Sequence, residues 1–271
     1  MSGAENQVAG IAYSTASDIM QLRKLLNDQY ADSSIFRELY QNADDAGANW
    51  VLVRYIEQGP GGHPLLDGPG VLVINDGYFK EENDEAIRRL GAGTKAQDAA
   101  AIGKFGFGLK SVFHWCEAFF YLASPNQEGG NGATFCRLFS PWGDRRLEWR
   151  TQTKRFDTCL KPLVDKAIRD AMPSLEIAAD TRWFALYIPL RRPEQWTSAG
   201  GDATRSPIVG NQPTPDTLFP KSLGGDTAEL LPLLRSVQRI RFHVPSTGFT
   251  AALTPDSTRT LGPEVLKADP A

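Results

Sequence analysis

The sequence predicts an α+β fold, a two-layer α/β sandwich with helices on one face of a mixed, mainly antiparallel β-sheet. Segments with helical spacing of apolar residues and short β-rich segments follow one another along the 271 residues, in an order that this architecture explains. The chain is long enough to bury a large core without disulfides or metal ions. Its 41% hydrophobic and 23% charged residues are typical of a soluble globular protein.

Local patterns give the elements in order. Helical spacing predicts helices at about 17–27, from 33 or 34 to 47, 81–90, from the glycines at 103–108 to 115, 161–171 and 227–237. Runs of β-branched and aromatic residues predict strands at 50–56, 71–74, 118–123, 133–139, 183–190 and 240–244. Residues 1–16 are expected to be frayed, 191–220 resemble a linker or long loop, and the tail after 246 shows no strong pattern.

Composition excludes several classes of protein. A net charge of −3 gives no broad cationic surface for nucleic acid. Cys116, Cys136 and Cys159 lie far apart without a CxxC pair, which favours reduced thiols and gives zinc little support. No run of about 18 apolar residues predicts a membrane span, and the first residues do not resemble a signal peptide. A cytoplasmic location fits these features best.

The first motif lies on the helix that ends near Gly47. Glu38, Asn42 and Asp45 follow one another at i, i+4 and i+7, which places them on one stripe. An amide oxygen is a suitable ligand for Mg²⁺, and a carboxylate one turn away can orient or deprotonate a water that attacks a phosphate. Taken alone, the motif fits a solvated polar helix face equally well.

The second motif is a buried strand that ends in Asn75-Asp76-Gly77. A carboxylate at the mouth of a pocket can accept a hydrogen bond from the amino group of adenine, and a glycine lets the base approach closely. The alternative is a plain turn, which these residue types also favour and which is preferred when the motif is considered alone.

The third motif is a glycine-rich loop that opens an apolar helix. Gly103, Gly106 and Gly108 precede the helix, where free backbone N–H groups form an anion site suited to phosphates. The loop lacks the GxxxxGK[ST] pattern and does not directly follow a strand, so neither a P-loop nor a dinucleotide-binding βαβ unit is expected. Lys104 either adds charge near the phosphates or is solvated.

The order and spacing of the three motifs resemble the GHKL, or Bergerat-fold, ATPase superfamily, which includes histidine kinases and gyrase B. The segments Glu38–Ala48 and Ile102–His114 are most similar to sacsin-type proteins, and the same layout occurs in heat-shock chaperones. The resemblance covers about residues 22–190. It implies a Bergerat-type domain that binds ATP and Mg²⁺.

The resemblance also implies roles for individual residues. Glu38 would be the general base, Asn42 the Mg²⁺ ligand, and Asp45 a residue lining the nucleotide pocket. The other expected nucleotide-binding residues are Asn75, Asp76, Gly77 and Phe79 near the base, Thr94 and Lys95 in a lid, Gly103, Lys104, Phe105, Gly106, Phe107 and Gly108 near the phosphates, and Thr181.

Two positions depart from the family pattern. The usual Asp-x-Gly-x-Gly is replaced by the sequence from Asn75 to Phe79, so either Asn75 or Asp76 can hold the adenine position. Asp76 is preferred because sacsin-type proteins show the same Asn-Asp order. Thr181 is the nearest candidate for the threonine that supports this acid, although the strand register can put Phe184 there instead.

The implied function is that of an ATP-hydrolysing domain whose lid closure drives conformational change in a chaperone-like or multidomain machine. The alternative is a nucleotide-sensing or scaffold module with little or no hydrolysis. Residues 1–195 would form the ATP-binding domain, 196–222 a linker or long loop, and 223–271 the start of a helix-strand subdomain. Expected partners are ATP and ADP, further domains or subunits, and a second copy in ATP-dependent dimerisation, with no membrane and no clear nucleic-acid surface.

Overall fold

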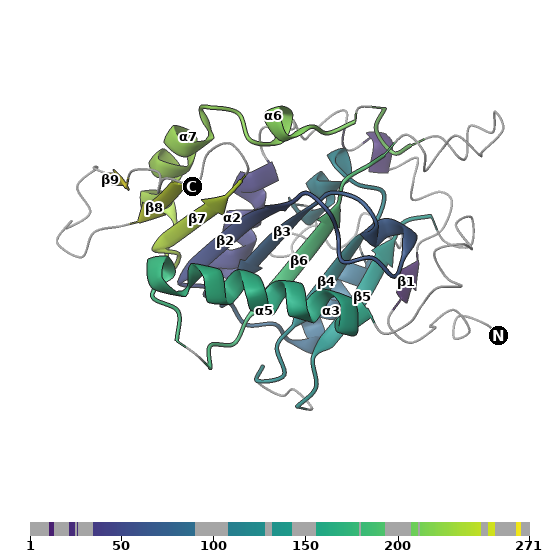
Figure 1. The fold of residues 1–271 in the computed structure, drawn as a ribbon, viewed down its shortest axis with the longest axis horizontal. Helices are drawn as coiled ribbons and strands as arrows, with labels where there is room; N and C mark the ends of the chain where they lie inside the picture. Colours follow the sequence, from purple (N-terminus) through teal and green to yellow (C-terminus); the bar gives the residue numbers. More distant parts are fainter. Residues whose placement is uncertain are drawn as a thin grey trace, which may run out of the picture.

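The computed structural model describes residues 11–13, 22–24, 26, 35–89, 108–127, 132–142, 156–178, 180–192, 207–210, 212–244, 249–252 and 264–266. Within these residues, a single sheet has the strand order β1-β5-β4-β6-β3-β2-β7-β8-β9 (Figure 1). The strands are β1 (Ile11–Tyr13), β2 (Trp50–Ile56), β3 (Gly70–Asn75), β4 (Phe119–Ala123), β5 (Phe135–Ser140), β6 (Phe184–Pro189), β7 (Arg239–His243), β8 (Phe249–Ala252) and β9 (Glu264–Leu266).

The strand pairing confirms the predicted sheet type. β1 runs parallel to β5 and β2 runs parallel to β7. The other pairs in the described sheet are antiparallel. The sheet is therefore mixed and mainly antiparallel, as the sequence predicts.

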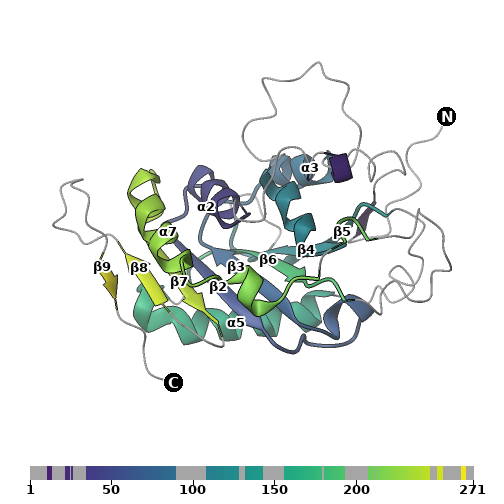
Figure 2. The same ribbon diagram turned by 90° about the horizontal axis from the view of Figure 1, so that it is seen from above.

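Helices cover the sheet on both faces. Figure 2 shows α2 (Ile35–Asp45), α3 (Glu81–Arg89) and α7 (Leu223–Leu230) on one side and the long α5 (Phe156–Leu175) on the other. The 3₁₀ helix η3 (Gly108–His114) packs beside α2, and three short helices are η2 (Pro64–Leu66), α6 (Pro215–Leu218) and η7 (Leu231–Leu233). The α+β class is confirmed. The expectation was of helices on one face of the sheet only, whereas α5 covers the second face as well.

The central strands explain the second helical layer. Every residue of β3 and of β4 is buried, so both faces of these strands need cover. On the α5 side, Phe120 of β4 meets Phe156 with ring centroids 4.9 Å apart. On the opposite side, Phe119 lies 5.6 Å from Phe113 of η3.

The helix α2 is held to the sheet by its apolar stripe. Phe36 and Tyr40 are buried, and their rings lie 5.3 and 6.4 Å from that of Phe242 in β7. The helix ends before Gly47, whose φ of +71° is the left-handed conformation that favours glycine after a helix. The packing of the apolar stripe and the turn at Gly47 together determine which way the polar stripe of α2 faces.

The C-terminal helix-strand unit continues the same sheet. β7 pairs with β2, and Asp44 of α2 accepts hydrogen bonds from the backbone N–H groups of Ser236 (2.6 Å) and Val237 (3.2 Å). Burial disfavours the ionised Asp44 carboxyl, but these bonds and those from Arg235 outweigh burial and lower its pKa. The described part of 223–271 is thus joined to α2 and β2, while the expected domain boundaries stay a prediction.

The remaining differences concern short or irregular elements. β1 forms at residues 11–13, where fraying was expected, and β8 and β9 form in the tail without a strong pattern. These strands have three or four residues, too few for a period to be recognised. The helix predicted at 161–171 is longer in the structure and includes Pro162 near its start and Pro173 near its end.

Candidate functional site

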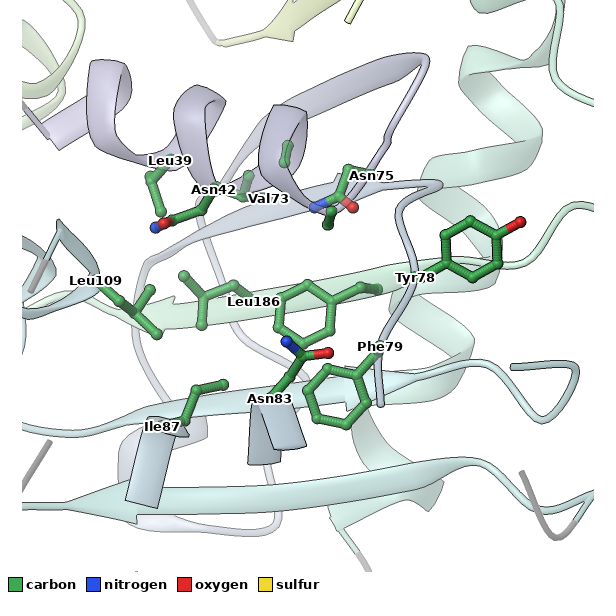
Figure 3. Close-up of a pocket in the computed structure, with 13 residues that line it drawn as sticks. Leu39, Asn42, Val73, Asn75, Tyr78, Phe79, Asn83, Ile87, Leu109 and Leu186 are labelled. Carbon is green, nitrogen blue, oxygen red and sulfur yellow. The ribbon is translucent and has the colours of Figure 1, made fainter. Parts of the chain in front are cut away.

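A pocket lies between α2, the end of β3, α3 and β6 (Figure 3). It is open at one side and lined mainly by apolar side chains, with three asparagines among them. Its described lining residues are Leu39, Asn42, Ala43, Ala46, Val73, Asn75, Tyr78, Phe79, Asn83, Ile87, Leu109, Phe184 and Leu186. A concave apolar pocket with a few polar groups is the usual form of a small-molecule site.

Two aromatic rings form part of the pocket wall. Phe79 and Phe184 are stacked, with centroids 5.0 Å apart and planes at 17°. The backbone N–H of Phe79 donates to Oε1 of Gln127 (3.0 Å), and Nε2 of Gln127 donates to the carbonyl of Trp183 (3.0 Å). The loop after β3 is therefore tied to β6, and Phe79 lies where the sequence predicts a nucleotide contact.

The end of β3 separates Asn75 from Asp76. Asn75 lines the pocket, while Asp76 accepts hydrogen bonds from the backbone N–H groups of Asn49 (2.7 Å) and Trp50 (3.1 Å) and from Nδ2 of Asn49 (2.9 Å). Adjacent residues of a strand point to opposite sides, so only one of the two can face α2. Asn75, the second candidate, therefore lines the pocket, whereas Asp76 fastens the start of β2, and the base contact itself stays a prediction.

Packing within the chain is enough to require glycine at position 77. A Cβ atom at this position would lie 2.7 Å from Cβ of Ala46 and 2.9 Å from Oδ1 of Asn75. The tight fit joins the end of β3 to the end of α2. Gly77 is not among the described residues that line the pocket.

Glu38 and Asn42 lie one turn apart on α2, as predicted. Asn42 lines the pocket, and Glu38 is half-buried next to the backbone of Gly108 at the start of η3. A Cβ atom at residue 108 would overlap Oε2 of Glu38 and lie 3.1 Å from its Cδ. Burial raises the pKa of the Glu38 carboxyl, and the charge of Arg37 offsets this only partly. A carboxyl of this kind is suited to accept a proton near neutral pH.

The far end of η3 is held by a buried ion pair. Arg191 pairs with Glu117, and its guanidinium donates to the carbonyls of Phe113 (2.7 Å) and Cys116 (3.0 Å). Nε1 of Trp142 donates to Glu117 (3.1 Å). These bonds fix the last turn of η3. Because Gly108 begins the same short helix, they also help to hold Gly108 beside Glu38.

Two predicted residues lie away from the pocket. Asp45 points toward Arg235 and forms an ion pair with it, so it contacts the C-terminal unit rather than the pocket. Thr181 lies with Asp76 beside a separate polar hollow. The strand register pairs Asn75 with Phe184, the alternative to Thr181, while the supporting role of either residue stays a prediction.

Several predicted residues fall outside the described part of the chain. They are Thr94 and Lys95 of the expected lid and Gly103, Lys104, Phe105, Gly106 and Phe107 of the glycine-rich loop. Gly108, the last glycine of that loop, is described and opens η3.

The helix α3 also contributes to the pocket, which was not predicted from the sequence. Asn83 and Ile87 are one helical turn apart and both line the pocket. Their spacing in a charged helix was the available signal. Tyr78, also missed, is 43% exposed at the pocket edge, and the guanidinium of Arg182 lies 3.7 Å from the centre of its ring.

Comparison with known proteins gives three similarities. Residues 17–128 match the family model of the Sacsin domain, and this range contains α2, β2, β3, α3, η3 and β4. Sacsin from Homo sapiens is 29% identical over 150 residues, which are 49% of this chain and 3% of sacsin. Chaperone protein HtpG from Bordetella pertussis is 33% identical over 120 residues, which are 34% of this chain and 18% of HtpG. The matched part thus spans a small fraction of each relative.

Among the described residues, none of the helices has both the length and the hydrophobicity that crossing a bilayer requires. The histidine, cysteine and carboxylate side chains of the same residues form no group of three that could hold a metal ion.

Proposed function

We propose that this chain, which carries a sacsin-type domain of the heat-shock-chaperone-like GHKL class, binds Mg-ATP and hydrolyses it slowly in isolation. The similarity to the Sacsin domain, to sacsin and to HtpG supports an ATPase-like, chaperone-related domain. We propose that this chain itself binds and hydrolyses ATP. The base would lie in the pocket between α2 and β3, and the phosphates would point toward Gly108.

The observation that carries the proposal is the convergence of three distant segments. Glu38 and Asn42 from α2, Asn75 from β3 and Gly108 from η3 surround one region although they are up to 70 positions apart in the chain (38 to 108). Glu38 touches the start of η3, and Asn42, one turn further along α2, lines the apolar pocket. A purine fits apolar walls, and triphosphate oxygens fit the N-terminal end of a glycine-opened helix.

In this proposal Glu38 acts as the general base. Its carboxylate accepts a proton from a water molecule while the water oxygen forms a bond to the γ-phosphorus. The bond between that phosphorus and the bridging oxygen breaks, which releases ADP and phosphate. The raised pKa of Glu38 strengthens it as a base relative to an exposed carboxylate.

Asn42 is the side chain suited to hold the metal ion. It lines the pocket one turn from Glu38, and an amide oxygen fits Mg²⁺, which keeps several waters and bridges phosphates. Bound Mg²⁺ would neutralise charge that develops on the phosphate oxygens. Asn42 would therefore keep the phosphates within reach of the carboxylate of Glu38.

The test is phosphate release by the purified chain with Mg-ATP, combined with calorimetric binding. We expect Glu38→Gln to reduce turnover about 10²-fold or more, while the affinity for ATP changes little because the amide keeps the side-chain shape. Glu57→Gln is the matched control, since Glu57 is exposed beyond the end of β2.

The outcomes separate the two proposed activities. Unchanged turnover in Glu38→Gln would contradict the assignment of the base. ATP binding by the wild type without phosphate release would select the nucleotide-sensing or scaffold role instead. A role in a chaperone-like machine, with lid closure and contacts to other domains or a second copy, belongs to the same proposal and requires the longer assembly for its test.

A further inference from the structure

We infer that Asp84 is a positioning residue for the pocket between α2 and β3, because it holds α3, and with it one wall of the pocket, against the sheet. This inference rests on the proposed function, since it concerns how tightly the same site binds its nucleotide. It follows from the contacts that join α3 to β4 and β5.

The helix α3 supplies one wall of the pocket through two side chains. Asn83 and Ile87 are one helical turn apart, and both line the pocket (Figure 3). The opposite wall belongs to α2, which buries a whole stripe of large apolar side chains. The shape of the pocket therefore depends on how firmly α3 is held.

Apolar packing gives α3 little attachment to the sheet. The sequence of α3 is EENDEAIRR, in which Ala86 and Ile87 are the apolar residues. Ile87 is buried, with 4% of the residue exposed. One buried isoleucine offsets only a small part of the conformational entropy that is lost when a helix of nine residues becomes ordered. A further contact is needed to keep α3 in place.

Asp84 supplies this contact. The residue is 5% exposed, and its Oδ1 accepts a hydrogen bond from the hydroxyl of Tyr121 in β4 at 2.8 Å. Nε of Arg137 in β5 lies 3.3 Å from the same oxygen. Tyr121 and Arg137 are opposite each other in the pairing of β4 with β5, so they point to the same side of the sheet. The carboxylate therefore joins α3 to two strands at once.

The burial of these groups makes the contact important for the position of α3. Tyr121 is fully buried, and the side chain of Arg137 is 17% exposed. Removal of the carboxylate takes an acceptor away from the buried hydroxyl and a counter-charge away from the guanidinium, and both losses are costly in a buried place. Water can replace the carboxylate if α3 moves away from the strands. Asn83 and Ile87 then leave the pocket together with α3.

Binding and turnover should respond differently to this displacement. When only a fraction of the molecules has a complete pocket, the apparent affinity for the nucleotide falls by that fraction. Glu38 is carried by α2 and faces Gly108 of η3, so the proposed base keeps its place. A loss of Asp84 should therefore raise KM and leave kcat unchanged. A purely structural role would instead lower the amount of folded protein, and thus the apparent kcat, without changing KM.

The experiment measures Mg-ATP binding by calorimetry and phosphate release for the wild type, Asp84→Ala and Asp84→Asn. We expect Asp84→Ala to weaken binding and raise KM about tenfold, the size of one hydrogen bond to a charged group. Asp84→Asn keeps an acceptor for Tyr121 but loses the charge that faces Arg137, so its effect should be smaller. Glu82→Ala is the matched control, because Glu82 is an exposed acid of the same helix, and it should leave binding and KM unchanged.

Hydrogen exchange of the nucleotide-free chain tests the attachment of α3 separately. Asp84→Ala should speed the exchange of the backbone amides of α3, whereas those of β2 and β3 should keep their protection. Tyr121→Phe serves if Asp84→Ala does not fold. It removes the hydroxyl that donates to Asp84 and keeps the ring beside that of Phe79, with centroids 6.2 Å apart, and it should give the same pattern more weakly.

The contradictory outcomes are distinct. If α3 exchanges no faster in Asp84→Ala, or exchanges faster while the affinity for Mg-ATP is unchanged, the inference is wrong and the nucleotide site stands. A loss of kcat at constant KM would also overturn it. If the wild type binds no Mg-ATP, the proposed function fails and the inference fails with it.

Discussion

Gly108→Ala tests the contact between Glu38 and the start of η3. The new Cβ atom would overlap Oε2 of Glu38 and lie 3.1 Å from its Cδ and 3.2 Å from its Cβ. Carbon atoms in contact lie about 3.5–4.0 Å apart, so the Glu38 side chain must turn away. A misplacement of about 1 Å at a catalytic group lowers the rate about 10²-fold, and we expect a loss of turnover of this size.

The cost in stability should be small compared with the cost in activity. The atom that moves is the end of a flexible side chain, so we expect the free energy of unfolding to fall by only about 1 kcal/mol. Phosphate release and chemical denaturation would be measured on the same preparation. Gly225→Ala is the control, because nothing lies within 4 Å of a Cβ there and Gly225 lies within the helix α7. Turnover of Gly108→Ala within twofold of wild type would refute the placement of the base.

Four further predictions concern the carboxylates of Asp76, Asp44 and Glu38. Asp76→Asn should lower the free energy of unfolding by about 1–3 kcal/mol, because the carboxylate accepts three hydrogen bonds at the start of β2; a change in nucleotide affinity above twofold would contradict this role. Asp44→Asn should destabilise the fold at pH 7, and the difference from wild type should shrink in denaturation curves as the pH falls below the ordinary pKa of 3.8 and through the lower folded-state pKa; a constant difference would argue against it. The raised pKa of Glu38 means that turnover is lost as pH falls through a value above 4.5. For the same reason, Glu38→Gln should increase stability at neutral pH, an increase that disappears below pH 4.5.

The sequence alone predicted the bounds of those helices and strands whose buried apolar residues follow a regular spacing. The predicted strand at 50–56 has the bounds of β2. The helix predicted from 33 or 34 to 47 extends beyond α2 by one or two residues at each end, and the helix predicted at 81–90 begins with α3 and ends one residue after it. In these segments the buried residues form one stripe of a helix or an apolar strand, and the spacing of apolar residues along the sequence shows this directly. The three motifs also lie on elements that meet in the structure, namely α2, the end of β3 and, for Gly108, the start of η3, while their role as a nucleotide site stays a prediction.

The sequence could not decide which face of β3 meets α2. Both faces of this strand are apolar and buried, so neither Val73 nor Ile74 indicates the direction of the pocket. A shift of one residue exchanges the two faces, which is why Asn75 and Asp76 could not be distinguished. Strands that are apolar on both faces, such as β3 and β4, indicate that both faces of the sheet are covered, so they could have predicted the position of α5.

Long-range contacts were also invisible in the sequence. Asp45 belongs to a polar stripe on α2, but the fold brings Arg235 against it from 190 residues away. The register of β6 places Phe184 rather than Thr181 beside Asn75. Both outcomes depend on pairing between distant segments, which no local pattern encodes.

The most direct test of the central claim is a crystal structure of the chain with a non-hydrolysable nucleoside triphosphate and Mg²⁺. The account predicts the base between Phe184 and α2 beside Asn75, with the phosphates near Gly108 and Glu38. A nucleotide bound away from α2, or none bound while the chain is folded, would contradict it.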